Sequence, residues 1–401
     1  MFGIIEIRIF LNSVLISLIP ANRGVFFLME KAKVTVTVKI KLTPTPEQSE
    51  RMLQTLHAYR QACNFVSQHV YETKKRSVIC LHKLLYRDLR EAFSLRSQMA
   101  QSVLKTVAAR YQSIVSNGHP WTQIHFKKPE YDLVWNRDYS LSKQIFSINT
   151  LEGRIKVPFV MQGMEIYFDG TWIFGTAKLV NRRGKWYLHI PVTKEVDRVT
   201  LPSIHQVVGI DLGINFVATT YDIAGKTVFY PGRPIKDKRS QYKHLRKTLQ
   251  QVGTPSARRK LKRIGERENR WMTDVNHRIS KALVSQYDPF TLFVVEDLTG
   301  IRTATERVRV QDRYENVSWS FLQLRKMIEY KAALRGARVV AVDPRYTSQT
   351  CPKCDRKNKA NRDKKKHHFC CMACGYQSND DRIAAMNLQG IGIKYIAEVA
   401  K

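Results

Sequence analysis

Three acidic residues lie where a carboxylate is costly unless it does chemistry. Asp211 ends the apolar run that begins at Val207, Glu296 ends the apolar run that begins at Phe293, and Asp381 begins a C-terminal helical pattern. A buried carboxylate must be paired, hydrogen-bonded or bound to metal. Acids from separate elements can converge on a pair of Mg²⁺ ions, the arrangement that in-line phosphodiester cleavage needs. The sequence therefore predicts a catalytic, magnesium-binding triad.

Each acid also has a simpler interpretation, because the first two could merely cap turns and the third could be a helix N-cap. Gly209 and Gly213 flank Asp211. We expect these glycines to let a phosphate backbone approach the acid closely. Asp297 should face away from Glu296, because successive residues of a strand point to opposite sides.

Five of the seven cysteines crowd into one short stretch. Cys351-Pro-Lys-Cys354 and Cys371-Met-Ala-Cys374 are separated by residues 355–370, a spacing typical of one structural Zn²⁺ held by two knuckles. Cys370 is then the spare thiol, unless the second knuckle starts one residue earlier. Unmetallated surface thiols are the simpler alternative. The odd number and the clustering favour a reducing cytoplasm over a disulfide framework.

Lys and Arg outnumber Asp and Glu by 67 to 34, a net charge of +33 that implies a polyanionic partner. Nucleic acid fits better than a membrane surface, because the charge is spread through folded-looking segments. Residues 236–281 hold 15 Lys or Arg against 4 Asp or Glu, although such a run can also be just a solvated face. Tyr242 and Trp271 in this run, and Tyr287 just after it, are interleaved as stacking or packing groups. The residues that we expect to contact phosphates are Arg246, Lys247, Arg258, Arg259, Lys260, Lys262 and Arg263.

The C-terminal half alternates strand and helix patterns, which places the acids at the ends of elements. Strands are expected at residues 207–213, 291–296 and 338–343, with a helix over 319–334. In the first half, residues 33–42 alternate strictly, and Thr45 begins a helical stretch that runs to Gly118. Strand patterns return at 145–159 and 172–192, which predicts a β-barrel interrupted by a helical insert.

The opening segment, residues 1–28, contains an apolar run from Ile9 to Ile19 but fits neither a signal peptide nor a membrane span. Met29 directly precedes the first regular strand. We therefore expect residues 1–28 to be a non-native or disordered extension.

The order of the motifs resembles the TnpB family of transposon-encoded, RNA-guided DNA endonucleases, which are related to miniature type V CRISPR effectors. The matching motifs are GIDLGI at 209–214, VEDL at 295–298, YKA at 330–332 and YTSQTCPKC at 346–354. The resemblance implies an α+β and α/β multidomain protein. Its expected parts are a wedge-like β-barrel (29–44 and 119–203), a helical recognition insert (45–118), an RNase H-like RuvC nuclease (204–345 and 379–401) and a zinc-binding target-nucleic-acid module (346–378).

The resemblance also implies the RuvC catalytic role for Asp211, Glu296 and Asp381, with two Mg²⁺, and the zinc-ligand role for the four knuckle cysteines. Two positions depart from the family pattern, because Ile383 replaces an asparagine and Asp355 stands where a glycine often follows the first knuckle. Asp380, beside Asp381, leaves a one-residue ambiguity in the third acid.

The implied partners are a guide RNA and a double-stranded DNA target cut beside a short flanking motif, with no membrane. The implied setting is the cytoplasm and nucleoid of a prokaryotic cell. Three alternatives remain open: a CRISPR-array-guided effector with the same chemistry, a guided DNA-binding repressor without cleavage, and a transposase that joins DNA ends. The oligomeric state stays open.

Overall fold

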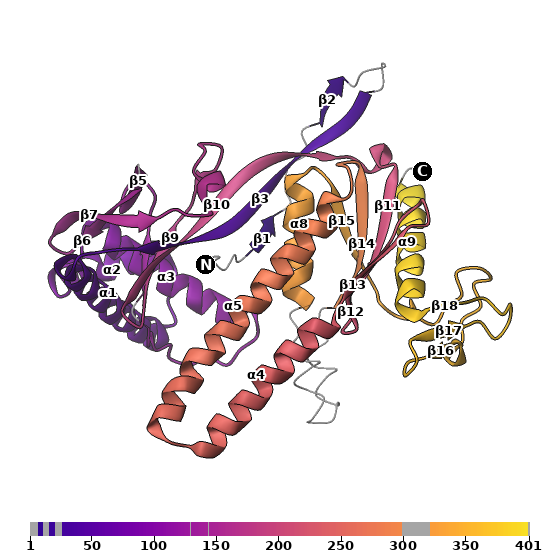
Figure 1. Cartoon of the computed structure of the whole chain (residues 1–401). Helices are drawn as coiled ribbons and strands as arrows, with labels where there is room; N and C mark the ends of the chain where they lie inside the picture. Colours follow the sequence, from indigo (N-terminus) through magenta and orange to yellow (C-terminus); the bar gives the residue numbers. More distant parts are fainter. Residues whose placement is uncertain are drawn as a thin grey trace. The chain divides into compact units, whose positions relative to one another are not determined.

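The computed structural model describes residues 7–10, 16–20, 26–128, 130–142, 144–298 and 321–399. The chain divides into two compact units, one made of Met1–Arg8 and Thr35–Lys194, the other of Ile9–Val34 and Glu195–Lys401. Two long strands, β3 (Phe26–Leu42) and β10 (Lys185–Val199), contribute residues to both units (Figure 1). Helices and strands are mixed throughout, as expected from the sequence.

The first unit contains three helices between β3 and the later strands, within the stretch that the sequence predicts to be helical. Thr45 forms the expected capping box, because its Oγ1 accepts from Gln48 N at 3.2 Å while Gln48 Oε1 accepts from Thr45 N at 3.1 Å. Ser67 Oγ and Tyr111 Oη lie 3.0 Å apart and join the first helix to the third. The three helices are α1 (Pro46–Thr73), α2 (Val78–Glu91) and α3 (Ser97–Ser116).

A ten-stranded sheet accompanies these helices, with the order β4-β9-β10-β3-β7-β6-β5. Val34, Val36, Val38 and Ile40 of β3 are buried and alternate with exposed or half-buried neighbours, which confirms the predicted strand. Strands β1, β2 and β8 pair beside this path, and closure into a barrel stays a prediction. The strand bounds are β1 (Ile7–Phe10), β2 (Ile16–Pro20), β4 (Glu130–Leu133), β5 (Tyr139–Ser142), β6 (Ile145–Thr150), β7 (Gly153–Val160), β8 (Ile173–Phe174) and β9 (Ala177–Arg182).

The second unit is built on a five-stranded sheet with the order β13-β12-β11-β14-β15. Strand β11 (Gln206–Asp211) pairs in parallel with β14 (Thr291–Glu296), which pairs in parallel with β15 (Arg338–Val342). The antiparallel strands β12 (Phe216–Tyr221) and β13 (Thr227–Pro231) complete one edge. Strands β11 and β14 are apolar and buried along nearly their whole length, as expected for central strands covered on both faces.

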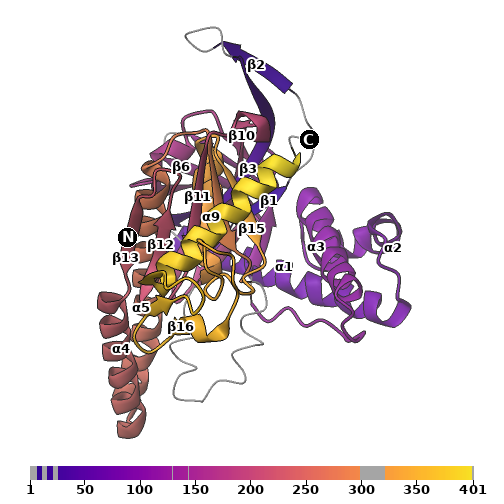
Figure 2. The ribbon, with the colours of Figure 1, turned by 90° about the vertical axis from the view of Figure 1, so that its right-hand side faces the viewer.

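Helices cover the two faces of this sheet. One face packs against α5 (Pro255–Ser285) and α8 (Phe321–Leu334) through residues that include Val208, Phe293 and Leu324. The other face packs against α9 (Asp380–Val399), which lies across the sheet in Figure 2. The start of the predicted helix over 319–334 lies outside the described residues, and its remainder is α8.

Two further parts project from the second unit. Helix α4 (Arg233–Val252) and α5 form an antiparallel hairpin, whose turn is set by Gly253 with a φ of 64° and by Thr254 as the N-cap of α5 (Figure 1). A small three-stranded sheet, β16 (Arg362–Asp363), β17 (His368–Cys370) and β18 (Gln377–Asn379), leads directly into α9. Short 3₁₀ turns occur at Glu165–Tyr167, Leu201–Ser203 and Lys359–Asn361.

Most of residues 1–28 lie outside the described ranges, so the prediction about this segment stays a prediction. Strand β2 falls within it and pairs antiparallel with β3. In the described part of the chain, no helix combines the length and the apolar character that crossing a membrane requires.

Candidate active site and nucleic-acid surface

The two-residue period of the strands brings Asp211 and Glu296 to the same face of the sheet. Val207 of β11 and Val294 of β14 pack on the α9 side, and Asp211 and Glu296 follow them at even spacing. The parallel pairing of Ile210 with Val295 then places the two acids side by side at the carboxyl ends of neighbouring strands. Both side chains are buried, and the strand period places them on the face that α9 covers.

Helix α9 reaches this face because Gly209 lets it come close. A Cβ atom on Gly209 would lie 2.0 Å from the Ala385 carbonyl oxygen and 2.5 Å from Gln389 N, both of them backbone atoms of α9. The prediction that Gly209 leaves room for a phosphate is therefore wrong, since the helix fills that space. Gly213 also faces protein backbone, because its Cβ would lie 3.0 Å from the Phe216 carbonyl oxygen.

Asp381 lies in the first turn of α9 and is not its N-cap. Asn379 has that role, because its Oδ1 accepts from the backbone N–H groups of Asp381 at 3.0 Å and Arg382 at 3.2 Å. The carboxylate of Asp381 is therefore free of the capping function that the simpler interpretation assigned to it. The helix start carries it to the end of the sheet where Asp211 and Glu296 lie.

The three acids are buried and raise one another's affinity for protons. Their exposed fractions lie between 7% and 9%. Burial, and then the charges of Glu296 and Asp381, raise the pKa of Asp211 well above its usual value. Burial also raises the pKa of Glu296, and burial with the neighbouring charge of Asp380 raises the pKa of Asp381 to about 6. Such a cluster is poorly neutralised by the protein alone.

Several partners of the acids were not predicted from the sequence. Thr347 Oγ1 donates to Glu296 Oε1 at 2.8 Å, and the positive charge of Arg362 offsets part of the rise in the pKa of each of the three acids. Asp380 is fully buried, and Arg362 Nε lies 2.7 Å from its Oδ2. Asp297 behaves as predicted, because it faces away from Glu296 and pairs with Arg325 Nη1 at 2.6 Å.

The acid site fits a divalent cation. Asp381 Oδ2 is buried and has no hydrogen-bond partner among the described residues, so it is an oxygen that lacks the compensation that burial demands. Carboxylate oxygens are the ligands that Mg²⁺ prefers. His367, Asp380 and Asp381 also offer ligand atoms within 4.8 Å of one another.

The four knuckle cysteines converge as the spacing predicts. Their sulfur atoms all lie within 4.8 Å of one another, with Cys351 Sγ 3.6 Å from Cys374 Sγ and Cys354 Sγ 3.6 Å from Cys371 Sγ. Backbone N–H groups of Cys374 and Ala373 lower the pKa of Cys371 to about 6, whereas burial and the neighbouring thiols raise the pKa of Cys354, so the protein alone favours a thiolate at Cys371. This cluster can hold one tetrahedral Zn²⁺.

The two knuckles share a turn that explains the departure at Asp355. Asp355 and Gly375 each follow the second cysteine of a knuckle, with φ values of 55° and 68°. Both backbone N–H groups donate to the carbonyl of the first cysteine, Cys351 or Cys371, at 2.9 Å. Aspartate is one of the few residues that tolerate this left-handed conformation, so the knuckle closes without glycine. Cys370 is outside the cluster, which supports the predicted register.

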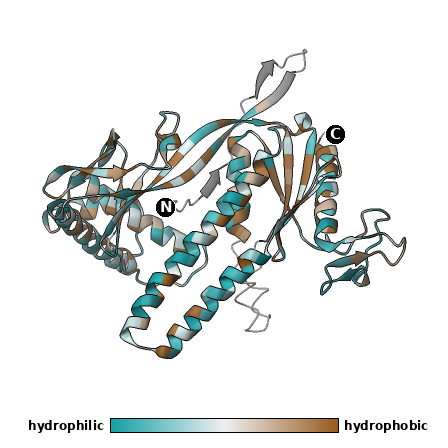
Figure 3. Cartoon of the chain, in the orientation of Figure 1, coloured by the Kyte–Doolittle hydropathy of each residue, from teal (hydrophilic) through white to brown (hydrophobic). Residues whose placement is uncertain are grey.

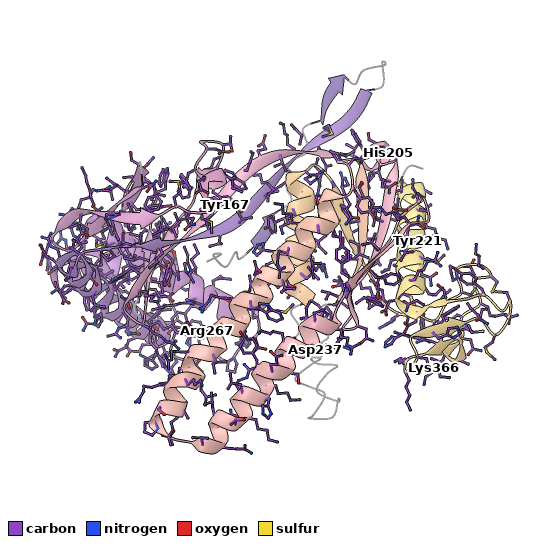
Figure 4. All side chains as sticks on the ribbon, viewed as in Figure 1. Tyr167, His205, Tyr221, Asp237, Arg267 and Lys366 are labelled. Carbon is purple, nitrogen blue, oxygen red and sulfur yellow. The ribbon has the colours of Figure 1, made fainter. Side chains whose placement is uncertain are left out.

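The α4–α5 hairpin carries the basic residues on its outer surface. Figure 3 shows the two helices as mostly hydrophilic, and in Figure 4 long side chains such as Arg267 extend from them. Six of the seven predicted phosphate contacts are exposed: Lys247, Arg258, Arg259, Lys260, Lys262 and Arg263. A small apolar core that includes Leu249, Ala257 and Ile264 holds the helices together near the turn.

Arg246 differs from the other six predicted contacts. It pairs with the buried carboxylate of Glu268, which also lies 3.6 Å from Arg239 Nε. This network joins α4 to α5, so Arg246 already has a structural partner. The interleaved aromatic residues also pack, because Tyr242 lies against the core near the turn and Trp271 against the sheet core.

Two family models match the second unit and its edges. The family described as "Probable transposase" matches residues 189–301, which contain β11, the hairpin and β14. The family described as "Cas12f1-like, TNB domain" matches residues 321–388, which contain α8, the cysteine cluster and the start of α9.

Curated relatives agree with these models. A CRISPR-associated endodeoxyribonuclease Cas12f1 of Sulfoacidibacillus thermotolerans is 27% identical over 270 residues, covering 62% of this chain and 62% of the relative. A putative RNA-guided DNA endonuclease InsQ of Escherichia coli is 28% identical, covering 53% and 56%. A TnpB-like protein of Methanocaldococcus jannaschii is 35% identical, covering 32% and 45%. The chain thus spans less than two thirds of the length of these relatives.

A solved structure extends the likeness of the fold beyond these segments. The protein in a cryo-EM structure of a Cas12f1–sgRNA–target DNA complex superposes with a TM-score of 0.60 at 15% identity, covering 86% of this chain and 83% of that one. The family models and the relatives agree with the resemblance that the motifs indicate: the chain is similar in sequence to TnpB-like and Cas12f proteins, and it shares the fold of the solved Cas12f1.

Proposed function

We propose that the protein is an RNA-guided endonuclease that cuts double-stranded DNA next to a short flanking motif. The observation that carries this proposal is the convergence of Asp211, Glu296 and Asp381, three buried acids that face one another at the start of α9. The names of its relatives, RNA-guided and CRISPR-associated endonucleases, agree with that chemistry. Its setting would be the prokaryotic cytoplasm, where such nucleic acids are found.

We assign the parts as the sequence indicates. The five-stranded sheet with α9 (204–345 and 379–401) would be the RNase H-like RuvC nuclease, and residues 346–378 the zinc-binding module that contacts target nucleic acid. Residues 29–44 and 119–203 would form the wedge-like barrel, with 45–118 as the recognition insert. The exposed cations of the hairpin would bind backbone phosphates of the guide or target.

The three acids would hold two Mg²⁺, and Cys351, Cys354, Cys371 and Cys374 would hold one Zn²⁺. Bound Mg²⁺ would supply charge that activates water and stabilises the leaving oxygen, giving 5′-phosphate and 3′-hydroxyl ends. The chain's own part is to hold three carboxylates together in spite of their repulsion. Thr347 fixes one oxygen of Glu296, and the capped start of α9 fixes Asp381.

The two sets of relatives favour two sources of guide. The transposase-family match and InsQ suggest a guide encoded with a transposon, whereas the Cas12f relatives suggest one from a CRISPR array. Sequencing the RNA that co-purifies with the protein decides between them. Structured RNA overlapping the 3′ end of the gene would indicate the transposon type, and repeat-spacer RNA the CRISPR type.

The same RNA allows the direct test. The protein loaded with that RNA is incubated with Mg²⁺ and plasmids that carry the matching target beside randomised flanking sequence. We expect linear products with 5′-phosphate ends from a subset of flanking sequences. Guided binding without cleavage would instead support the repressor, and joined DNA ends would support a transposase.

A further inference from the structure

We infer that His367 and Arg362 of the zinc module are positioning residues. They contact the buried Asp380 and thereby hold the neighbouring Asp381 in place beside the other metal-binding acids. The inference rests on the proposed function only in taking the acid cluster as a metal site. Asp380 is the residue on which the argument depends, because it starts α9 and has no exposed surface.

The first support for Asp380 comes from Arg362. Arg362 Nε lies 2.7 Å from Asp380 Oδ2, and Arg362 Nη1 donates to Ser348 Oγ at 2.8 Å. Removing one partner of a buried ion pair is strongly destabilising, because the other charge remains uncompensated. Asp380 is therefore part of the scaffold, and it cannot serve as a neutral control for Asp381.

The second support is the His367 ring, whose Nδ1 lies 3.3 Å from Asp380 Oδ1. That oxygen is buried and has no hydrogen-bond partner among the described residues, so the ring is a polar group placed beside a carboxylate oxygen that lacks compensation. On its other side the ring meets Asn215, whose amide nitrogen faces both ring nitrogens and whose Oδ1 accepts from Lys236 Nζ in the first turn of α4.

His367 also belongs to a grouping that could suggest a third metal site, because its ring lies within 4.8 Å of the ligand atoms of Asp380 and Asp381. Asp380 already has a cationic partner, since Arg362 Nε lies 2.7 Å from its Oδ2. A network that orients the acids accounts for the same grouping.

The backbone of His367 also contacts the start of α9. Its carbonyl accepts from the Asp380 backbone N–H at 3.4 Å and from Asn379 Nδ2 at 3.3 Å. Asn379 in turn caps the helix at Asp381. Because these backbone contacts do not depend on the imidazole, replacing the side chain should test positioning without dismantling the module.

The experiment measures Mn²⁺ binding by the purified, zinc-loaded full chain, with Mn²⁺ as the probe for the acid site. His367→Leu should weaken Mn²⁺ binding about tenfold, because groups that orient metal ligands typically contribute 10- to 100-fold in affinity. His367→Asn should bind within about threefold of wild type, since its side-chain amide keeps a polar nitrogen beside Asp380 Oδ1 where Nδ1 of the ring lies. The control is His368→Leu, the same change at the adjacent, exposed histidine, which should bind like wild type.

Wild-type Mn²⁺ affinity in His367→Leu would overturn the inference. So would a loss of zinc in that variant, which would give His367 a role in folding the module, or failure of His367→Asn to restore affinity. Guided cleavage by the wild type is measured separately. If the wild type does not cleave but the variants show the expected Mn²⁺ affinities, the proposed function is wrong and the positioning role stands. If the wild type cleaves but the Mn²⁺ affinities do not change as expected, the positioning role is wrong and the proposed function stands.

Discussion

The acid site and the α4–α5 hairpin both gather like charges, but they handle the resulting repulsion in opposite ways. Asp211, Glu296 and Asp381 are buried beneath α9, where burial and mutual repulsion raise their pKa values. The cations of the hairpin, such as Arg258 and Lys260, are exposed on the surface of two helices. Water and salt screen the second group, whereas the first needs counter-charge at fixed positions.

This contrast indicates a division of labour. Buried carboxylates in fixed geometry suit one or two small cations and a defined reaction. Exposed cations suit a polyanion of any sequence and contribute affinity without selecting bases. We therefore expect changes in the acid site to alter cleavage and changes in the hairpin to alter binding.

The largest expected effect comes from the cysteines that hold the module beside the acids. Cys351→Ser or Cys374→Ser should lower the zinc content from about one per chain to near zero and unfold the module, because structural zinc supplies folding energy outright. Cleavage should be lost with it. The matched control is Cys370→Ser, which removes a thiol outside the cluster and should retain zinc. A wild-type zinc content well below one per chain would refute the site.

The next effect concerns the hairpin. Joint replacement by Gln of Arg258, Arg259, Lys260, Lys262 and Arg263 should flatten the log-log salt dependence of duplex affinity by up to about 4.5 units, because each neutralised phosphate contributes about 0.9. Target choice should not change. Arg246→Gln is the comparison, since Arg246 pairs with Glu268 and should change the slope by less than one such contact. An unchanged slope in the five-site variant would mean that these cations face solvent and do not contact phosphates.

The next prediction compares a glycine beneath α9, Gly209, with a glycine in the hairpin, Gly265. Gly209→Ala should destabilise the protein by about 3 kcal/mol, because its Cβ would overlap backbone atoms of α9. Gly265→Ala, in the open middle of α5 with no atom within 4 Å of a new Cβ, should stabilise it by about 0.5–1 kcal/mol. Denaturant unfolding of both variants tests this. Equal effects would show that α9 does not need the close approach.

The smallest expected effect concerns the stability that the fold loses because the carboxylate of Asp381 is buried. Burial raises the pKa of Asp381 to about 6, above the value of about 3.9 in an unfolded chain. The folded state therefore holds the proton more tightly, and the ionised carboxylate destabilises the fold above about pH 6. In zinc-loaded protein without Mg²⁺, the free energy of unfolding of Asp381→Asn should be about 1–3 kcal/mol higher than that of wild type at pH 7.5. The gap should close as the pH falls toward 4, and a gap independent of pH would contradict this.

The sequence predicts the positions of the acids better than their surroundings. Apolar strands that end in Asp211 and Glu296 are visible in the pattern, and period two places both on one face. The cysteine spacing likewise predicts which four thiols converge. Asp380 and Arg362 could not be recognised, because their importance arises only when β16 and α9 meet in space.

The same limit explains what was misread. Gly209 next to an acid suggested a phosphate, because nothing in the local sequence shows that Ala385 of α9 occupies that space. Arg246 looked like the other cations until α5 brought Glu268 beside it. Contacts between segments far apart in the chain decide such roles.

The most direct test of the division of labour measures binding and cleavage on one guide-loaded sample of Glu296→Gln. This change keeps the shape of the side chain and removes only the charge, so guided DNA binding should match wild type while cleavage falls by about 10³-fold or more. The matched control is Asp343→Asn, an exposed acid that directly follows the next parallel strand, β15, and should cleave like wild type. Cleavage by Glu296→Gln at the wild-type rate would contradict the assignment of the acid site.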